Sequence, residues 1–204
     1  MKNILFIILT ISFLISCSKK DYVPQLPPDK LPDATTIGAN TAGCYVNGKL
    51  IILVNTIDST SGYPVFGLKY YVGPNFGPPL FNEYFAVRIA NLKNSGITYT
   101  IYLQLNNLAN GIGNYALGQS NDMFFIDGPD NPQIIVSEVN TTISTGKRFI
   151  SSVNSGVINI TRFDYVNKII SGTFNCNLTS NQNENEIIKV TDGRFDINLV
   201  TLNI

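Results

Sequence analysis

The chain has 204 residues, and its 14 lysines and arginines balance its 14 aspartates and glutamates, so the formal net charge is zero at pH 7. Charged residues make up only 14% of the sequence and no basic face is indicated, so nucleic acid is not predicted as a partner. The sequence contains no histidine, which excludes Ser-His-Asp and Cys-His catalysis and the histidine-rich zinc sites of most hydrolases.

Residues 1–16 have the features of a secretory signal peptide. Lys2 is the only charged residue before an apolar run from Ile4 to Ser16. This run has about 13 residues, whereas about 20 are needed to cross the hydrocarbon core of a bilayer as a helix. A short basic start, an apolar stretch of this length and small residues near its end predict a segment that is cleaved off.

The apolar run ends in Leu14-Ile15-Ser16-Cys17, which resembles the lipobox of bacterial lipoproteins. The resemblance implies that the thiol of Cys17 receives a diacylglyceryl group and that the chain is cut directly before it. Two or three acyl chains hold a protein stably on a membrane, because each buried methylene contributes about 0.8 kcal/mol. We therefore expect the membrane to be a partner of this chain through Cys17, and we expect a location in the cell envelope.

Residues 17–37 predict an extended tether between the lipid and the rest of the chain. The segment has no apolar periodicity and contains Pro24, Pro27, Pro28 and Pro32. Proline fixes its own φ and favours extended geometry in the residue before it, so about 20 residues would reach roughly 60 Å. Ser18 differs from the aspartate that resembles an inner-membrane retention signal, which favours the outer membrane and leaves its periplasmic and surface faces both open.

Residues 38–204 predict a single all-β domain. Apolar residues alternate with small or polar ones in segments such as 85–90 and 99–105, as in half-buried strands. Asn47-Gly48 and Asp192-Gly193 predict tight hairpin turns. Roughly ten short strands predict an antiparallel β-sandwich, with a β-barrel as the alternative.

Five sequence blocks lie in order across this domain: GANTAGCYVNGK (38–49), GIGNYAL (111–117), SGVINITRFD (155–164), NKIISGTFNCNL (167–178) and VTDGRFDI (190–197). They resemble the blocks of an uncharacterised lipoprotein family of the Bacteroidota, a domain of unknown function. The resemblance implies no activity. Position 176, a cysteine here, is more often aromatic in that family, so no shared role is implied for it.

Two cysteines remain once Cys17 is assigned to the lipid. An oxidising envelope permits a disulfide between Cys44 and Cys176. Cys176 alternates in phase with Phe174 and Leu178, so a small buried apolar side chain is the other reading. The sequence leaves both open.

Carboxylates are the remaining candidates for catalysis. The tripeptide Arg-Phe-Asp occurs at 162–164 and again at 194–196, and residues two apart share a strand face. A glycosidase would need Asp164 and Asp196 about 5 to 9 Å apart in a cleft, with one pKa raised. Neighbouring arginines would lower both pKa values, so an exposed cross-strand ion-pair ladder is expected. A carboxylate-based hydrolase, which could also use Glu138, is the alternative.

The loop from Asp127 to Asn131, with Asp122 before it, offers oxygen ligands of the kind that calcium prefers. It lacks the acidic alternation and the closing glutamate of an EF-hand. Ordinary turn chemistry explains the same residues, so no metal and no cofactor are predicted.

Aromatic residues concentrate in segment 69–85, among glycines and prolines, and make it the candidate binding segment. They could stack on sugar rings or enter a groove of a partner, or they could close one end of the core. The predicted function is a non-catalytic envelope module that binds a glycan, a peptide or a protein. The candidate binding residues are Tyr70, Tyr71, Phe76, Phe81 and Tyr84.

We expect the mature protein to begin at Cys17 and to carry acyl chains on it. Mass spectrometry of the native protein should show a mass that corresponds to residues 17–204 plus the lipid. An unmodified Cys17, or an intact apolar run before it, would contradict the predicted anchor.

Overall fold

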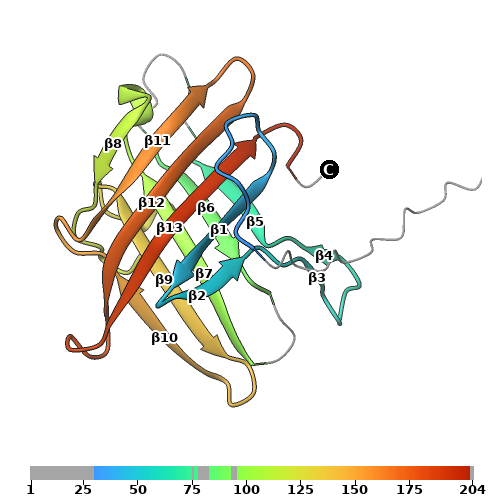
Figure 1. Cartoon of the computed structure of the whole chain (residues 1–204), viewed down its shortest axis with the longest axis vertical. Helices are drawn as coiled ribbons and strands as arrows, with labels where there is room; N and C mark the ends of the chain where they lie inside the picture. Colours follow the sequence, from blue (N-terminus) through green and yellow to red (C-terminus); the bar gives the residue numbers. More distant parts are fainter. Residues whose placement is uncertain (1–29, 75, 78–82, 93–95, 203–204) are drawn as a thin grey trace, which may run out of the picture.

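The computed structural model describes residues 30–74, 76–77, 83–92 and 96–202. The predicted all-β class is confirmed, because strands dominate this part of the chain (Figure 1). The elements are β1 (Thr41–Val46), β2 (Lys49–Ile52), β3 (Thr56–Ile57), β4 (Pro64–Val65), β5 (Leu68–Val72), β6 (Phe85–Ala90), β7 (Ile97–Leu105), η2 (Leu108–Asn110), β8 (Gly113–Ala116), η3 (Phe125–Asp127), β9 (Gln133–Asn140), β10 (Thr145–Ile150), β11 (Gly156–Asp164), β12 (Ile169–Ser180) and β13 (Ile187–Asn198). Among the residues described, no helix has the length and apolar character that crossing a membrane requires.

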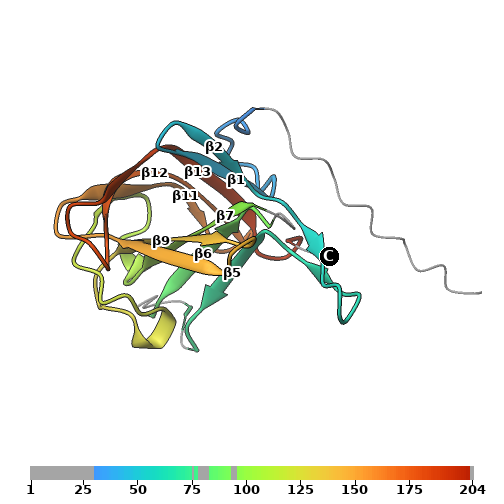
Figure 2. The ribbon, with the colours of Figure 1, turned by 90° about the horizontal axis from the view of Figure 1, so that it is seen from below.

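One antiparallel sheet contains eleven of the strands, and β12 is its branch point. The main path is β2-β1-β13-β12-β10-β9-β7-β6-β5, and β3 and β4 form a separate hairpin. The long strand β12 pairs with β13 on one side, whereas its other side pairs first with β11 and then, at its end, with β10. The sheet can therefore fold over itself, so that β12 and β13 lie in one layer and β5, β6 and β9 in the other (Figure 2).

The core lies between these two layers and is built from the alternation that the sequence predicts. Val87 and Ile89 of β6 and Phe174 and Leu178 of β12 are almost completely buried there. The fold combines features of the two predicted architectures, because its layers face each other as in a sandwich and remain hydrogen-bonded through β10 and β12 as in a barrel.

Of the two predicted hairpin turns, one is confirmed and one is wrong. Asn47 and Gly48 both have positive φ and connect β1 to β2. Asp192 and Gly193 lie inside β13, where the register with β12 shifts by a bulge. A Cβ atom at Gly193 would come within 2.5 Å of the ring of Phe174, so this glycine allows the ring to pack against the strand.

Cys44 and Cys176 are both buried in the core and both free. Of the two alternatives that the sequence leaves open, a disulfide or buried thiols, the structure has the buried thiols. Burial raises the pKa of Cys44 to about 12. Burial, and then the proximity of Cys44, also raise the pKa of Cys176. Neither thiol is therefore a thiolate at neutral pH, and neither is suited to act as a nucleophile.

The end of the predicted tether lies on the outer face of the sheet, where the blue segment in Figure 1 runs beside β13 before entering β1. The carboxylate of Asp196 is 1% exposed and accepts five hydrogen bonds there. One comes from the hydroxyl of Ser171 at 2.6 Å and one from that of Thr35 at 2.7 Å. The other three come from backbone N–H groups of residues 37–39 at 2.8 to 3.0 Å.

Both arginines of the Arg-Phe-Asp repeats bind the same N-terminal segment. Arg162 donates to the carbonyl of Thr36 at 2.6 Å, and Arg194 donates to the carbonyl of Pro32 at 3.2 Å. We call Arg162, Arg194 and Asp196 the tether clamp. The predicted cross-strand ladder of ion pairs is wrong, because β12 separates the two repeats. Arg162 forms an ion pair with Asp164 of its own repeat, and the charged groups of the second repeat bind the segment 32–39 and Ser171.

The pKa of Asp196 reflects this arrangement. Burial raises it, but the hydrogen bonds from Ser171, Ala39, Thr35 and Gly38 outweigh burial and leave the pKa below its ordinary value. The folded state therefore favours the charged carboxylate more than the unfolded chain does. The resulting stability is present above the unfolded pKa and is lost as the pH falls through the lowered one.

We expect Asp196→Asn to destabilise the domain by about 3 kcal/mol, because its amide NH₂ would face N–H donors in a buried site. Urea unfolding at neutral and acidic pH measures the free energy of unfolding. Toward low pH this free energy should decrease less in the variant than in the wild type, because the variant lacks the carboxylate that becomes protonated. Asp192→Asn is the matched control, since Asp192 is an exposed aspartate of the same strand and asparagine also adopts its positive φ. Equal stability of the wild type and Asp196→Asn would contradict the role of the clamp.

Candidate ligand-binding face

The predicted binding aromatics divide between the two sides of strand β5. Successive side chains of a strand point to opposite faces, so Tyr70 faces the core side and Tyr71 the outer side. Phe76 packs against the core with its ring 5.9 Å from that of Phe85. Tyr84 lies with Tyr71 at the outer side, and Phe81 is outside the described residues. One segment of sequence thus contributes to two separate surfaces.

Tyr70 and Phe76 line a groove of about 240 Å³ at the open end of the two layers. The hydroxyl of Tyr70 donates to the backbone carbonyl of Leu199 at 3.0 Å, which bridges the two layers. The opposite wall contains Tyr165 and Lys168, whose ammonium lies 3.3 Å from the centre of the tyrosine ring. Tyr70 and Phe76 mainly close the end of the core, as in the alternative reading of the sequence.

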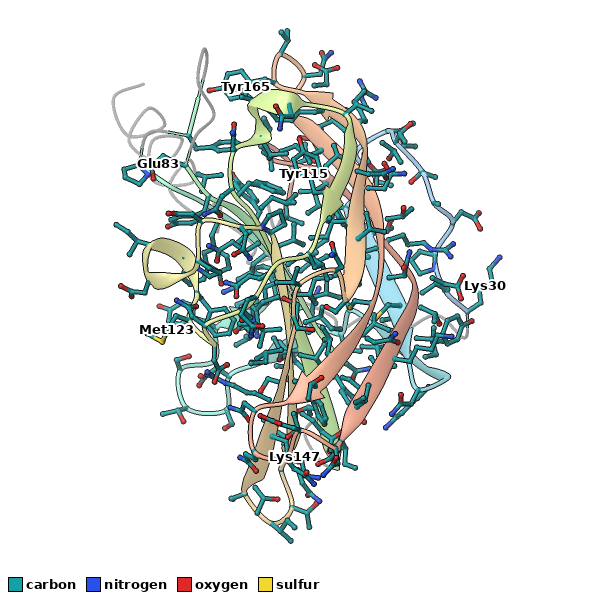
Figure 3. All side chains as sticks on the ribbon, turned by 90° about the vertical axis from the view of Figure 1, so that its left-hand side faces the viewer. Lys30, Glu83, Tyr115, Met123, Lys147 and Tyr165 are labelled. Carbon is teal, nitrogen blue, oxygen red and sulfur yellow. The ribbon has the colours of Figure 1, made fainter. Side chains whose placement is uncertain are left out.

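The outer side of the second layer carries a larger cluster of half-buried rings, which we call the aromatic face. Its members are Tyr71, Tyr84, Tyr102, Phe124 and Phe125. The ring centre of Phe125 is 4.7 Å from that of Tyr71 and 5.7 Å from that of Tyr84. Phe124 lies 4.3 Å from Tyr102. In Figure 3 the loop with Met123 lies outside this layer, on the side of the molecule opposite Lys30.

Sequence reasoning missed Tyr102, Phe124 and Phe125 as members of this face. Tyr102 belongs to a regular strand and carries no signal of its own. The adjacent phenylalanines stand in a segment rich in Asn, Asp and Gly, where a ring pair has no strand partner in sequence. The adjacent pair Phe124-Phe125 is the feature of the sequence that could indicate a binding surface, but only the fold shows that the pair lies against β5 and β7.

Two buried glutamines fix the loop that carries Phe124 and Phe125. The amide of Gln104 accepts from the N–H of Phe125 at 2.8 Å and donates to its carbonyl at 3.0 Å. Gln133 donates to the carbonyl of Met123 at 2.8 Å and accepts from Ser120 at 2.6 Å. Phe125 has a φ of 59°, which is unusual for a bulky residue, and the Gln104 amide holds it there. The ring is therefore positioned before any partner binds.

A polar groove borders the aromatic face. Its volume is about 340 Å³, and it is lined by Asp122, Ser137, Gly146, Lys147, Arg148, Asn181 and Gln182. The guanidinium of Arg148 lies 5.3 Å from the ring centre of Phe124 and 3.2 Å from the carboxylate of Asp122. The second oxygen of that carboxylate accepts from the amide of Asn181 at 2.9 Å. Arg148 thus connects the aromatic face, through Phe124, with the hydrogen-bonded pair of Asp122 and Asn181 in the groove.

The structure does not bring the candidate catalytic carboxylates together. Strand β12 lies between Asp164 and Asp196, because it pairs with β11 on one side and β13 on the other. Asp164 bonds to Arg162 at 2.7 Å and to Asn167, and these contacts hold its pKa well below the usual range. Glu138 belongs to β9 in the other layer. A general acid needs a raised pKa and a proton that it can give to a substrate. Asp164 has a lowered pKa, and Asp196 is buried and bonded to five donors, so neither fits this role.

The candidate calcium loop also serves other contacts. Asp122 binds Arg148 and Asn181, and Asp127 closes the short helix η3. Within the described ranges, no group of three or more cysteine, aspartate or glutamate residues is placed to hold a metal ion.

Comparison with known protein families, with curated proteins and with solved structures gives no match to this chain. Any functional assignment therefore depends on the chemistry of its own residues.

We expect Gln104→Ala to release the loop of the aromatic face, because both backbone bonds to Phe125 are lost. The variant should lose about 1 to 3 kcal/mol of stability and be cut faster by chymotrypsin after Phe124 or Phe125. Gln119→Ala is the matched control, since Gln119 is exposed and its amide reaches only the neighbouring carbonyl of Ser120. Identical cleavage of the wild type and Gln104→Ala would contradict this role of Gln104.

Proposed function

We propose that this chain is a lipid-anchored protein of the cell envelope, held at the outer membrane through Cys17, whose β-domain binds a partner without catalysis. The signal-peptide pattern, the lipobox resemblance and the proline-rich tether support the anchor. The resemblance of the five sequence blocks to a lipoprotein family of the Bacteroidota supports the same location.

The observation that carries the binding proposal is the pre-positioned aromatic face. Its rings are only half-buried, although they pack on one another, and the loop beside them exposes Met123 at 49% and Ile126 at 78%. Exposed apolar side chains that gather on one rigid surface are typical of interaction sites. Gln104 and Gln133 lower the entropic cost of binding, because the loop is already ordered.

A carboxylate-based hydrolase remains the alternative, with less support. Five donors occupy the oxygens of Asp196, and Asp164 is bonded to Arg162 and Asn167. Such carboxylates are poor proton donors at neutral pH. Strand β12 separates Asp164 from Asp196, and Glu138 lies on β9 in the other layer, so the three candidates do not form the paired-carboxylate cleft of a glycosidase.

The tether clamp also bears on how far the domain stands from the membrane. Because Arg194 binds the carbonyl of Pro32, only the residues before Pro32 could separate the domain from a lipid on Cys17. About 14 residues at about 3.1 Å each would then reach roughly 45 Å, instead of the roughly 60 Å expected for the whole tether.

Binding is tested with residues 18–204, which keep the clamp and lack only the lipidated cysteine of the mature chain. These residues are presented to a glycan array and to solubilised envelope proteins. We expect a ligand whose affinity falls at least about tenfold in the double variant Tyr71→Ala/Phe124→Ala, because rings at the centre of an interface carry much of its affinity.

Tyr63→Ala is the matched control, since Tyr63 is an exposed tyrosine (74%) on the β3–β4 hairpin, away from the aromatic face. Circular dichroism and thermal unfolding show whether each variant is folded. Absence of any ligand, or equal binding by the folded double variant, would count against the proposal.

A further inference from the structure

The polar groove beside the aromatic face has the composition of a site for hydroxyl groups. Three separate segments form it: the loop with Asp122, the β9–β10 hairpin with Ser137 and Arg148, and the β12–β13 turn with Asn181 and Gln182. The main chain joins two of these segments, because the N–H of Asn181 donates to the carbonyl of Arg148 at 2.9 Å. The groove is thus a built part of the fold, and flexible surface side chains alone do not define it.

The charged groups of this groove are already paired within the protein. Arg148 bonds to Asp122 at 3.2 Å, and Lys147 bonds to Glu186 at 2.7 Å. An ionic ligand would have to replace these pairs. The lining also contains hydrogen-bonding groups without charge, namely the Ser137 hydroxyl and the Gln182 amide, and the Arg148 guanidinium has more N–H groups than its bonds to Asp122 use. This set suits an uncharged ligand with several hydroxyl groups.

The aromatic face begins directly beyond Arg148. The described residues that line the groove are not aromatic, but the guanidinium of Arg148 lies 5.3 Å from the ring centre of Phe124, which packs in turn against Tyr102 and Phe125. A pyranose ring has an apolar face of C–H groups and a rim of hydroxyl groups. One sugar unit would therefore bind the polar groups of the groove through its hydroxyl groups, and the next units of the same glycan would place their C–H faces on the exposed parts of the rings.

We propose that the polar groove binds a neutral sugar unit of a glycan that extends over the aromatic face. The proposal rests on the binding function proposed above and names its ligand class. Arg148 is the central residue, because its side chain contacts both Phe124 and Asp122. A protein partner on the same face is a different outcome, which the test below separates.

Substitution of Gly146 by a larger residue can block this groove selectively. It lies on β10, and its φ is not among the positive values, so other residues fit its backbone. The nearest atoms to a Cβ at this position are the Glu138 carbonyl oxygen at 3.4 Å and a methyl group of Val139 at 3.6 Å. Gly146 lines the groove and lies two positions before Arg148 on the same strand, so a larger side chain would point to the same face and occupy part of the groove without removing any polar group that lines it.

The experiment is isothermal titration calorimetry of residues 18–204 with four neutral hexasaccharides: maltohexaose, cellohexaose, xylohexaose and mannohexaose. Hexagalacturonate is the charged comparison. We expect at least one neutral hexasaccharide to bind with a dissociation constant between about 10 µM and 1 mM. Its affinity should be nearly independent of salt, because no ion pair forms on binding.

Two variants locate the site. Gly146→Leu should abolish binding, and Arg148→Lys should weaken it at least about tenfold, because lysine keeps the charge and loses the planar fork of N–H groups. Asn175→Leu is the matched control for added bulk, since Asn175 is an exposed strand position in the other layer. It should bind as the wild type does.

The proposal is overturned if no neutral hexasaccharide binds, if folded Gly146→Leu binds as tightly as the wild type, or if only hexagalacturonate binds in a salt-dependent manner. A protein ligand that depends on Tyr71 and Phe124 but is indifferent to Gly146→Leu would overturn the sugar assignment and leave the binding function standing. Loss of all ligands on the array and among envelope proteins would overturn both.

Discussion

The entry of the chain into the β-domain depends on the hydrogen bonds of the buried carboxylate of Asp196. It lies on the outer face of the sheet, where a charge is tolerated only because five donors surround it. Three of those donors are backbone N–H groups of the segment that leads into β1, so the same contacts fix where β1 begins. Ser171 completes the set from the neighbouring strand and ties β12 to the same point. A single acidic residue thus organises the entry of the chain into the domain and three adjacent strands.

The branch of the sheet at β12 determines which surfaces of the strands stay outside the core. Folding the sheet over encloses one face of every strand and leaves the other face to solvent or to loops. The loop with Phe124 and Phe125 then covers part of the outer face of the second layer, and the N-terminal segment covers part of the first. Because the two coverings lie on opposite sides of the molecule, the tether and the aromatic face do not compete for the same surface (Figure 3).

Much of the fold follows from local patterns, and much of the site does not. Alternation in segments such as 85–90 predicts the strands and their core faces, and Asn47-Gly48 predicts a turn that the structure has. Asp192-Gly193 has the same local signal but forms a bulge, because the ring of Phe174 needs the space beside Gly193. The separation of Tyr70 from Tyr71 was available from the period of two along a strand. The contacts of Gln104 with Phe125, and of Arg148 with Phe124, join residues 21 and 24 positions apart through tertiary packing, which no sequence window reveals.

The position of the tether clamp has a mechanical consequence if Cys17 carries the proposed lipid anchor. A pull on the N-terminal segment would then reach Arg194 and Asp196 before it reaches β1. There it loads several hydrogen bonds at once across the face of the sheet, instead of peeling β1 from β13 one bond at a time. Tension on the anchor is therefore shared among groups that must rupture together, and the paired strands behind them are shielded from it.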